Sequence, residues 1–489
     1  MAYRFLTYLT VLGTALSGTI LTAPSASAET LQETLISVYN KNPQLLAARA
    51  RLREVDESYI QARAQGRPSV IASGQSSLSY ITGNVSPAAV PSAGSPTEIG
   101  RISQTFTPSA AQIEVIQPLY QGGRIKALKS QAKAGILAQR ESLRAVENRL
   151  FLAAASTYLD VQLAEETARV RRENVRVLTR QSVAAQERFD VGQGTRTDIA
   201  QSDARLANAE SGLAQADAQL QSVRASYRRL VGRIPLNLET VPTFAMPKTL
   251  EQALKNGREN NPELIASYFN EQAGKAAIDV AKAAGRPVLS LNGIAGAQRG
   301  QLFGLEDAET AEIRAQISVP IFSGGLNKSR VRQAKQAKIR LGFETRDREW
   351  AVDEQITQIW AQKGAAEQSL IAGRKQVEAA ELAFEGVTLE QEVGARSQLD
   401  VLDAEREVLN ARLAMINSQK AVNAVKFQLL AAIGVFDSES IRLRYDNLYT
   451  PDANFEAIQN DGFKKLTDKV SDTIEKISPD LSENDTKTP

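Results

Sequence analysis

The longest pattern of hydrophobic and polar positions belongs to helices. Residues 125–190 and 327–391 contain no proline and are rich in Ala, Gln, Glu, Arg and Leu. In the second stretch Leu370, Val377 and Phe384 are seven residues apart, and Ala380 and Val387 form a second seam. This spacing indicates coiled-coil-like packing. Each stretch predicts one helix of roughly 100 Å, at a rise of about 1.5 Å per residue.

A strict two-residue alternation predicts strands at two places in the chain. In "EIRAQISVPIF", residues 312–322, apolar and polar side chains fall on opposite faces. The apolar face holds Ile313, Ala315, Ile317 and Val319, and the polar face holds Glu312, Arg314, Gln316 and Ser318. Similar segments in the first half predict one two-stranded hairpin per half, at about 67–118 and 286–322. Periodicity alone fits a half-buried soluble hairpin as well as a membrane strand.

Shorter helices complete each half. Residues 30–41 look helical, Asn42-Pro43 interrupts, and a second helix runs to about Gln65, where Gly66 and Pro68 stop it. Further helices return to about Leu230 and Ala432. Two short helices stacked end to end match the length of one long helix. We therefore expect a joint midway along a rod, near the Asn-Pro pairs, Gly232 and residues 233–247.

The chain is a tandem duplication. "TLQETLISVYNKNPQLLAARA" from Thr30 resembles "TLEQALKNGRENNPELIASYF" from Thr249, an offset of 219 residues. From "QPLYQGGRIKA" at Gln117 and "VPIFSGGLNKS" at Val319 the offset is 202. The first copy thus carries 17 extra residues, which we assign to a loop at 80–100, rich in Pro, Gly and Ser. The predicted units are a signal peptide (1–28), two repeats (29–248 and 249–436) and a C-terminal extension (437–489).

Gly-containing turns recur at matching places in both copies. "VGQGTRTD" and "VGARSQLD", at 191–198 and 393–400, raise the possibility of a phosphate-binding loop, but no strand precedes them. We interpret them as tight helix–helix turns in which glycine frees the backbone and Thr195 or Ser397 caps the next helix. The turn residues are Val191, Gly192, Val393 and Gly394, and the strand-to-helix turns hold Pro118, Gly122, Gly123, Pro320, Gly324 and Gly325.

The composition excludes most kinds of catalytic and metal-binding site. The chain has 58 basic and 56 acidic residues and neither cysteine nor histidine. The charge balance argues against nucleic acid as a partner. Zinc sites of the usual kind, Cys nucleophiles and Ser-His-Asp triads are excluded, so we expect no enzyme, no cofactor and no metal. At the N-terminus Arg4, an apolar stretch at 5–21 and Ala26-Ser27-Ala28 predict a signal peptide cleaved before Glu29; an uncleaved anchor is the alternative.

These features together resemble the TolC family of outer-membrane channel-tunnel proteins, over about residues 29–436. The marks are the duplicated Asn-Pro helix, the strand ends "QPLYQGGR" and "VPIFSGGL", and the turns "VGQGTRTD" and "VGARSQLDVLDA". The resemblance implies a mostly α fold with a small β part. Long antiparallel helical hairpins and two β-hairpins per chain would trimerise into a 12-stranded β-barrel on an α-helical tunnel. The chain would lie in the outer membrane, in contact with its lipid, and extend into the periplasm.

The resemblance also implies a function and a gate. A homotrimer would be the passive exit duct for type I protein secretion, drug efflux or both, with a periplasmic adaptor and an inner-membrane ABC or proton-driven transporter. "DVLD" matches an aspartate ring, Asp400 and Asp403. Arg396 and Asp198 match a constraint that holds the tip closed, and Gln391 stands where the family usually has tyrosine. The alternative for Asp198 and Asp400 is that they favour the first turn of their helices.

Two other classes of protein remain open. A periplasmic adaptor would have one hairpin and usually a membrane anchor, and a soluble coiled-coil scaffold would not need alternating strands. The absence of cysteine points to the branch of the family without a lipid-acylated N-terminus. In the tail, an amphipathic face is predicted for Phe463, Leu466, Val470, Ile474 and Ile477, and the composition beyond Ser478 is typical of disorder.

Overall fold

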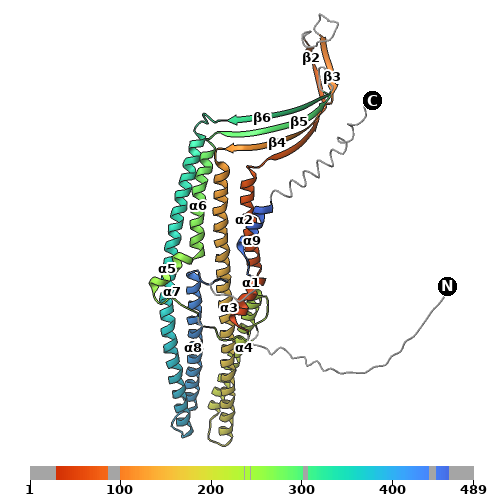
Figure 1. The fold of residues 1–489 in the computed structure, drawn as a ribbon. Coiled ribbons are helices and arrows are strands. Elements are labelled where there is room, and N and C mark those ends of the chain that lie inside the picture. The colour runs from red at the N-terminus through yellow and green to blue at the C-terminus, as the bar shows by residue number, and fades with distance from the viewer. Residues whose placement is uncertain are drawn as a thin grey trace, which may run out of the picture.

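The chain forms a long helical rod with a β-sheet across one end (Figure 1). The computed structural model describes residues 29–85, 100–235, 237–242, 244–300, 307–439 and 448–461. The predicted signal peptide, most of the predicted 80–100 loop and the predicted amphipathic tail helix lie outside these ranges. The predicted fold class, long helical hairpins with a small β part, is confirmed.

Two helices of 67 residues each run nearly the whole length of the rod. Three shorter helices of each repeat lie beside them, and a last helix follows the second repeat (Figure 1). The helices are α1 (Leu31–Lys41), α2 (Pro43–Ala64), α3 (Arg124–Asp190), α4 (Arg196–Val231), α5 (Leu250–Asn260), α6 (Pro262–Ala283), α7 (Leu326–Glu392), α8 (Gln398–Ala432) and α9 (Pro451–Asp461). Among the described residues no helix has both the length and the apolar character needed to cross a membrane.

An asparagine joins two short helices end to end in each repeat. Asn261 Oδ1 accepts from the backbone N–H of Glu263 at 3.0 Å and so caps α6, while Asn261 Nδ2 donates to the carbonyl of Ala432 at the end of α8, at 2.9 Å. Asn42 does the same in the first repeat, where its Nδ2 donates to Leu230 O at 3.0 Å. One amide side chain thus satisfies groups that both helix ends would otherwise leave unpaired. This is the mid-rod joint that the sequence predicts.

The largest hydrophobic core lies at this joint. Its bulkiest members come from α1, α3, α4, α8 and the segment after α8, and include Leu35, Phe151, Tyr158, Tyr227, Phe427 and Phe436. Glu29 is buried within the same belt, at 3% exposure, because its carboxylate accepts from Tyr227 Oη at 2.6 Å and from Arg233 Nη2 at 2.6 Å. Burial of an ion is tolerated here since its oxygen is multiply hydrogen-bonded.

The main sheet is antiparallel throughout, in the order β1-β4-β5-β6. Its strands are β1 (Ser69–Ser76), β4 (Ser109–Gln121), β5 (Val288–Arg299) and β6 (Asp307–Ser318). β4 and β5 pair across the two repeats, which leaves β1 and β6 as the edges. Both faces of β1 are exposed, so this sheet is not covered by the rod.

The structure differs from the predicted elements in three details. Strand β6 ends at Ser318, not at Phe322. Its partner β5 begins at Val288, opposite Ser318, and Pro320 has no N–H for a ladder. Residues 80–85 are strand, not loop: β2 (Ser79–Val85) pairs with β3 (Gly100–Phe106) in a separate hairpin beyond the main sheet. The extension after the second repeat also contains α9, which packs on α2 through Tyr59 and Phe455.

Candidate functional site

The end of the rod opposite the sheet is formed by two helix–helix turns with the same backbone. Gly192 and Gly394 have φ of 77° and 79°, and a Cβ at either would meet no atom within 4 Å. Glycine is therefore required here by the left-handed conformation and not by crowding. Gln193 N donates to Arg188 O at 2.8 Å, and Ala395 N donates to Glu390 O at 2.8 Å. Val191 and Val393, one residue earlier, are exposed.

Both return helices begin with a reciprocal capping arrangement. Thr195 caps α4 and receives the Asp198 N–H at 3.2 Å, while Asp198 Oδ2 accepts from Thr195 N at 2.9 Å. Ser397 and Asp400 repeat this geometry at α8, with 3.2 and 2.9 Å. The hydrogen bonds from Ser397 lower the pKa of the Asp400 carboxyl. Each aspartate thus stabilises the first turn of its own helix. The backbone N–H groups of Thr195, Asp198, Ser397 and Asp400 are already hydrogen-bonded within these turns.

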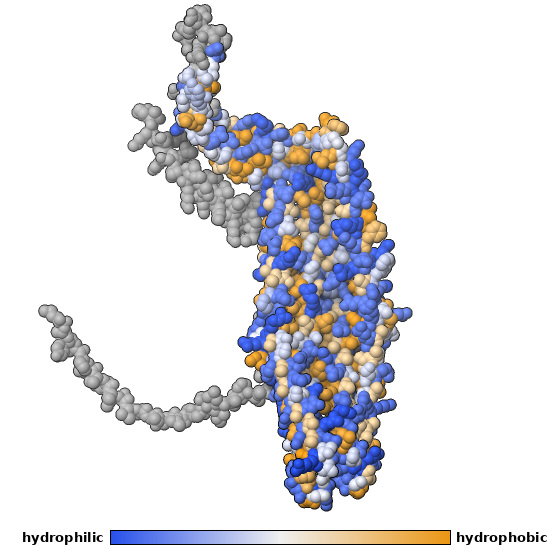
Figure 2. Space-filling view, turned by 180° about the vertical axis from the view of Figure 1, so that it is seen from behind, coloured by the Kyte–Doolittle hydropathy of each residue, from blue (hydrophilic) through white to orange (hydrophobic). Residues whose placement is uncertain are grey.

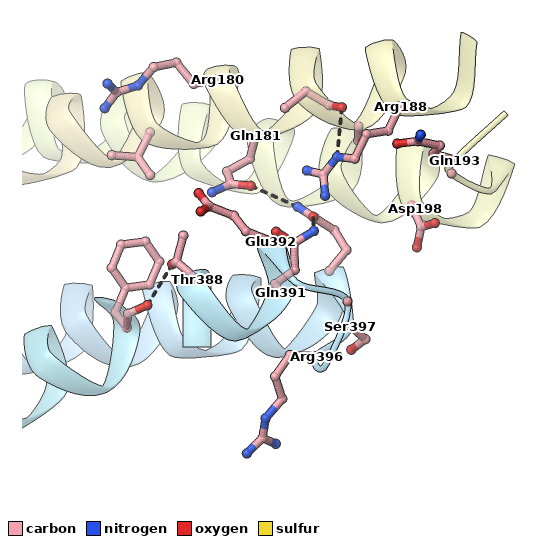
Figure 3. Close-up of a pocket in the computed structure, with 17 residues that line it drawn as sticks. Arg180, Gln181, Arg188, Gln193, Asp198, Thr388, Gln391, Glu392, Arg396 and Ser397 are labelled. Carbon is pink, nitrogen blue, oxygen red and sulfur yellow. Dashed lines mark hydrogen bonds between the residues drawn. The ribbon is translucent and has the colours of Figure 1, made fainter. Parts of the chain in front are cut away.

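Arg396 and Asp198 do not meet within one chain. Arg396 Nε donates to Glu390 Oε2 at 2.8 Å, and its side chain points away from the α3–α4 turn (Figure 3). Gln391 instead approaches the other hairpin indirectly. Its Nε2 lies 3.5 Å from Gln398 Oε1, and Gln398 Nε2 donates to Gln181 Oε1 at 3.0 Å.

Three further residues connect the hairpins near the tip, and sequence reasoning missed them. Gln181 and Gln398 form the amide bridge just described. Arg205 of α4 donates to Asp403 Oδ1 at 2.9 Å, and Arg406 lies 3.4 Å from the same oxygen. No local motif marks Gln181, Gln398 or Arg205, because each lies far in sequence from its partner on the other hairpin and only the packing of the hairpins brings the two together.

A groove of about 950 Å³ separates the two turns (Figure 3). Its lining includes Arg180, Arg188, Asp198, Gln391, Glu392 and Arg396. Arg188 extends between the hairpins while its Nε donates to Ala184 O of its own helix at 3.1 Å. Within the described ranges, no group of acidic residues could hold a metal ion.

The strand-to-helix turns lie at the other end of the long helices. The glycine pairs Gly122-Gly123 and Gly324-Gly325 all have positive φ. Gly122 is also crowded: a Cβ there would lie 2.7 Å from the Cβ of Arg286, whose Nη1 donates to Gly122 O at 3.0 Å. Pro118 lies within β4 at a shift in its register with β5, whereas its counterpart Pro320 follows the end of β6.

Comparisons with known proteins agree with this architecture. The outer membrane efflux protein family model matches residues 36–233 and 253–435. The outer membrane efflux protein BepC of Brucella suis is 29% identical over 451 residues, which is 92% of this chain and 94% of the relative. The outer membrane protein TolC of Vibrio cholerae is 24% identical over 358 residues, 68% of this chain and 78% of the relative.

Solved structures show the same fold. The outer-membrane channel CmeC of Campylobacter jejuni superposes with a TM-score of 0.69 at 16% identity, over 89% of this chain and 90% of that one. VceC of Vibrio cholerae gives a TM-score of 0.67 at 19% identity, over 83% and 96%. The resemblance that the sequence predicts is confirmed, and neither an adaptor nor a soluble scaffold accounts for a family match that spans both repeats. The chain belongs to the outer membrane efflux protein family and is not an enzyme but an exit duct of the outer membrane that extends into the periplasm.

Proposed function

We propose that three copies of this chain close into one duct, with twelve strands in the outer membrane and the helices as a tunnel across the periplasm. The open sheet is the observation that carries the proposal. Four antiparallel strands leave edges β1 and β6 that run in opposite directions. β6 of one copy can therefore pair antiparallel with β1 of the next, and a closed ring removes every edge.

The exposed side chains of the sheet support a membrane position. On β6, Ile313 and Ile317 are 82% and 68% exposed, and they alternate with the polar residues Glu312, Arg314 and Gln316. Figure 2 shows hydrophobic side chains on the surface at the sheet end of the rod. In a closed ring the apolar face would contact lipid and the polar face would contact water.

Helix α7 supports assembly along the rod. It leaves large apolar side chains exposed over much of its length, namely Leu326, Ile339, Phe343, Trp350, Ile371, Leu382 and Leu389. Exposed large apolar side chains that recur along one helix are typical of an interface. In the proposed trimer, a neighbouring copy would cover these side chains.

We further propose that the tip is the gate. Asp400 and Asp403 of three copies would surround one narrow opening. Asp198, Arg396 and Gln391 would constrain the closed tip, with Arg396 reaching a neighbouring copy since its side chain turns away from Asp198 of its own chain.

Transport through a passive duct needs energy from partners. We propose a periplasmic adaptor and an inner-membrane ABC or proton-driven transporter, in type I protein secretion, drug efflux or both. Relatives named as efflux proteins support this class of partner.

The test combines assembly and conduction. Protein extracted from outer-membrane fractions should have the mass of three chains, run as a heat-modifiable species, and form channels in planar bilayers. Crosslinking in cells before extraction should recover an adaptor and an inner-membrane transporter. A monomer that forms no channel would contradict the proposal.

A further inference from the structure

The backbone of Glu29 is held by the segment that follows α4. Its N–H donates to Asn237 O at 2.7 Å, and its carbonyl oxygen accepts from the N–H of Glu239 at 3.0 Å. Glu29 thereby forms a parallel bridge with Leu238. The Tyr158 hydroxyl lies 2.9 Å from the same carbonyl oxygen. These contacts hold Glu29 in one conformation, as a strand holds its members.

The side chain of Glu29 is held as closely as its backbone. Its Oε1 accepts from Tyr227 Oη at 2.6 Å, from Arg233 Nη2 at 2.6 Å and from Thr34 Oγ1 at 3.2 Å. The whole residue is 3% exposed. We name the group around it the N-terminal cluster, which comprises Glu29, Glu33, Tyr158, Tyr227, Arg233 and Glu239.

The order of events follows from this burial. The predicted signal peptide ends at Ala28, so the bond to be cut joins Ala28 to Glu29. A peptidase needs accessible chain, whereas Glu29 is buried once the N-terminal cluster has formed. Cleavage must therefore come first. Hydrolysis consumes one water and leaves a carboxylate on Ala28 and an α-ammonium on Glu29, which has two more N–H donors than the amide it replaces.

The charges of the N-terminal cluster favour an added cation. Burial raises the pKa of the Tyr158 phenol, and the carboxylates of Glu29, Glu239 and Glu33 raise that pKa further. Three carboxylates thus act on one place, where Arg233 supplies one positive charge. A buried charge is tolerated when groups of opposite sign surround it. An α-ammonium on Glu29 offsets part of the excess negative charge, and its nitrogen is already fixed by the backbone.

We infer that Glu29 is the mature N-terminus and that its α-ammonium is a structural cation of the N-terminal cluster, so that removal of the signal peptide completes the mid-rod core. The inference rests on the predicted cleavage site and not on the proposed duct. The cluster joins α1, α3, α4 and the segment after α4. A chain that keeps its signal peptide lacks this cation at the place where the first repeat closes, and is less stable there.

Amine labelling tests the position of the ammonium directly. Purified protein is acetylated near the ordinary α-amino pKa of about 7.7–8.0, then unfolded and treated with the deuterated reagent. Mass spectrometry of the N-terminal peptide gives the share of each label. We expect the Glu29 amine to react about tenfold more slowly in the folded protein than after unfolding, because it is buried and charged. Lys255 on α5, whose side chain is 73% exposed, is the internal reference and should react in both states.

A two-residue insertion moves the amine out of the N-terminal cluster. Gly-Ser placed between Ala28 and Glu29 keeps the cleavage signal and every residue of the cluster, and it makes the Glu29 nitrogen an amide again. The new amine should be labelled as fast as in the unfolded chain, and the variant should melt at a lower temperature than the parent at neutral pH. Gly-Ser inserted at Ser92, in the predicted 80–100 loop, is the matched control and should leave the melting temperature unchanged.

The pH dependence separates charge from steric strain. The carboxylates of the cluster favour the charged form of the amine, against its burial and the charge of Arg233, so the folded protein holds this proton more tightly than the unfolded chain. The stabilisation is present below the ordinary α-amino pKa of about 7.7–8.0 and is lost as the pH rises beyond it. The melting difference between parent and insertion variant should therefore vanish at high pH. Tyr158 and Tyr227 are present in both proteins, so their ionisation cancels.

Every outcome decides the inference. A mature chain that begins at another residue, or whose mass shows that Glu29 has cyclised to pyroglutamate, overturns it. Equal labelling of the amine before and after unfolding does the same. A melting difference that stays constant with pH assigns the effect of the insertion to strain and removes the ionic role. Bilayer conductance is recorded on the same preparation, so failure of these tests in a conducting trimer leaves the proposed duct intact.

Discussion

The Asn261 side chain donates to the carbonyl of Ala432 at 2.9 Å, which binds the start of α6 to the end of α8. These residues are 171 positions apart in the chain. The same side chain caps α6 through its oxygen, so it needs both a donor and an acceptor. Among the side chains that cap helices well, asparagine has both in one rigid amide.

Asn261→Asp should therefore destabilise the protein although aspartate caps helices as well as asparagine does. The variant keeps the acceptor but loses the donor to Ala432, and it brings a negative charge to the C-terminal end of α8, where the helix dipole is also negative. We expect a loss of about 1–2 kcal/mol in unfolding free energy. Denaturant unfolding followed by circular dichroism measures it.

The control is Asn417→Asp, which removes an exposed side-chain donor to Leu413 O inside α8 and should cost far less. Asn42→Asp should repeat the Asn261 effect in the first repeat. If Asn261→Asp and Asn417→Asp are equally stable, the end-to-end joint does not depend on this hydrogen bond.

Two glycines at equivalent repeat positions should respond differently to alanine. Gly232 and Gly434 have φ of 86° and 75°, so alanine is strained at both. At Gly232 a Cβ would meet no atom within 4 Å, but at Gly434 it would overlap the Asn260 carbonyl and approach Asn261 Cα at 2.8 Å.

Gly232→Ala should cost about 1–2 kcal/mol from backbone strain alone. Gly434→Ala should cost a further amount of about 1–3 kcal/mol, because the backbone of the α5–α6 joint must move. Thermal unfolding of the two variants under identical conditions compares them. Equal melting temperatures would show that the crowding at Gly434 is relieved without cost.

Much of this joint could be predicted from the sequence, because its signals are local. The Asn-Pro pairs mark a cap followed by a residue that begins helices well, and Gly232 follows the last residue of α4. The identity of the carbonyl that Asn261 binds is not local. It depends on how the return helix packs, so the sequence predicts that two helices stack at this place but not which atoms join them.

In the sheet and at the tip, too, local features could be predicted from the sequence and those that depend on packing could not. Alternation predicts β6, but not its end at Ser318, because that end depends on where the partner strand β5 begins, at Val288. The β2–β3 hairpin was missed because its strands, SYITGNV and GRISQTF, contain glycine and serine and flank a stretch rich in Pro, Gly and Ser. The capping residues Thr195 and Ser397 are visible in the sequence, whereas the Arg205–Asp403 contact follows only from the packing of α4 on α8.

Glu147 should make stability depend on pH. Its carboxylate is buried and accepts from Ser438 N at 2.5 Å. Burial raises its pKa above the ordinary value of 4.5, although the hydrogen bonds from Ser438 oppose this. The folded state therefore binds the proton more tightly than the unfolded state. Its contribution to stability is fully present below pH 4.5 and is lost as pH rises through the folded pKa.

Glu147→Gln keeps an acceptor for Ser438 and removes the charge. The variant should melt at a higher temperature than the parent at pH 7, and this difference should shrink as the pH falls through the folded pKa toward 4.5. Glu378→Gln, which changes an exposed carboxylate on α7, is the control for net charge. A difference that stays constant across the pH range would assign the effect to packing and not to ionisation.

The aspartates at the tip make the most direct prediction about transport. Asp400 and Asp403 of three copies would bring six carboxylates to one opening, and rings of carboxylates attract cations. Hydrogen bonds from Ser397 lower the pKa of Asp400 in each chain, which favours its charged form at neutral pH. The closed channel should therefore pass small cations at low conductance, and multivalent cations should block it from the tip side.

Replacement of both residues by alanine should abolish this block and reduce cation selectivity, while the trimer persists because neither side chain contributes to the sheet. Asp190→Ala is the control: it removes an exposed carboxylate at the tip that accepts from Gln186 of the same helix, so the block should remain. Arg396→Ser should raise conductance, because it removes the partner of Glu390 and the proposed contact with a neighbouring copy. Planar-bilayer recordings decide among these variants. If the double alanine variant is still blocked by multivalent cations, Asp400 and Asp403 do not line the opening, and helix capping together with the Arg205 contact is their whole role.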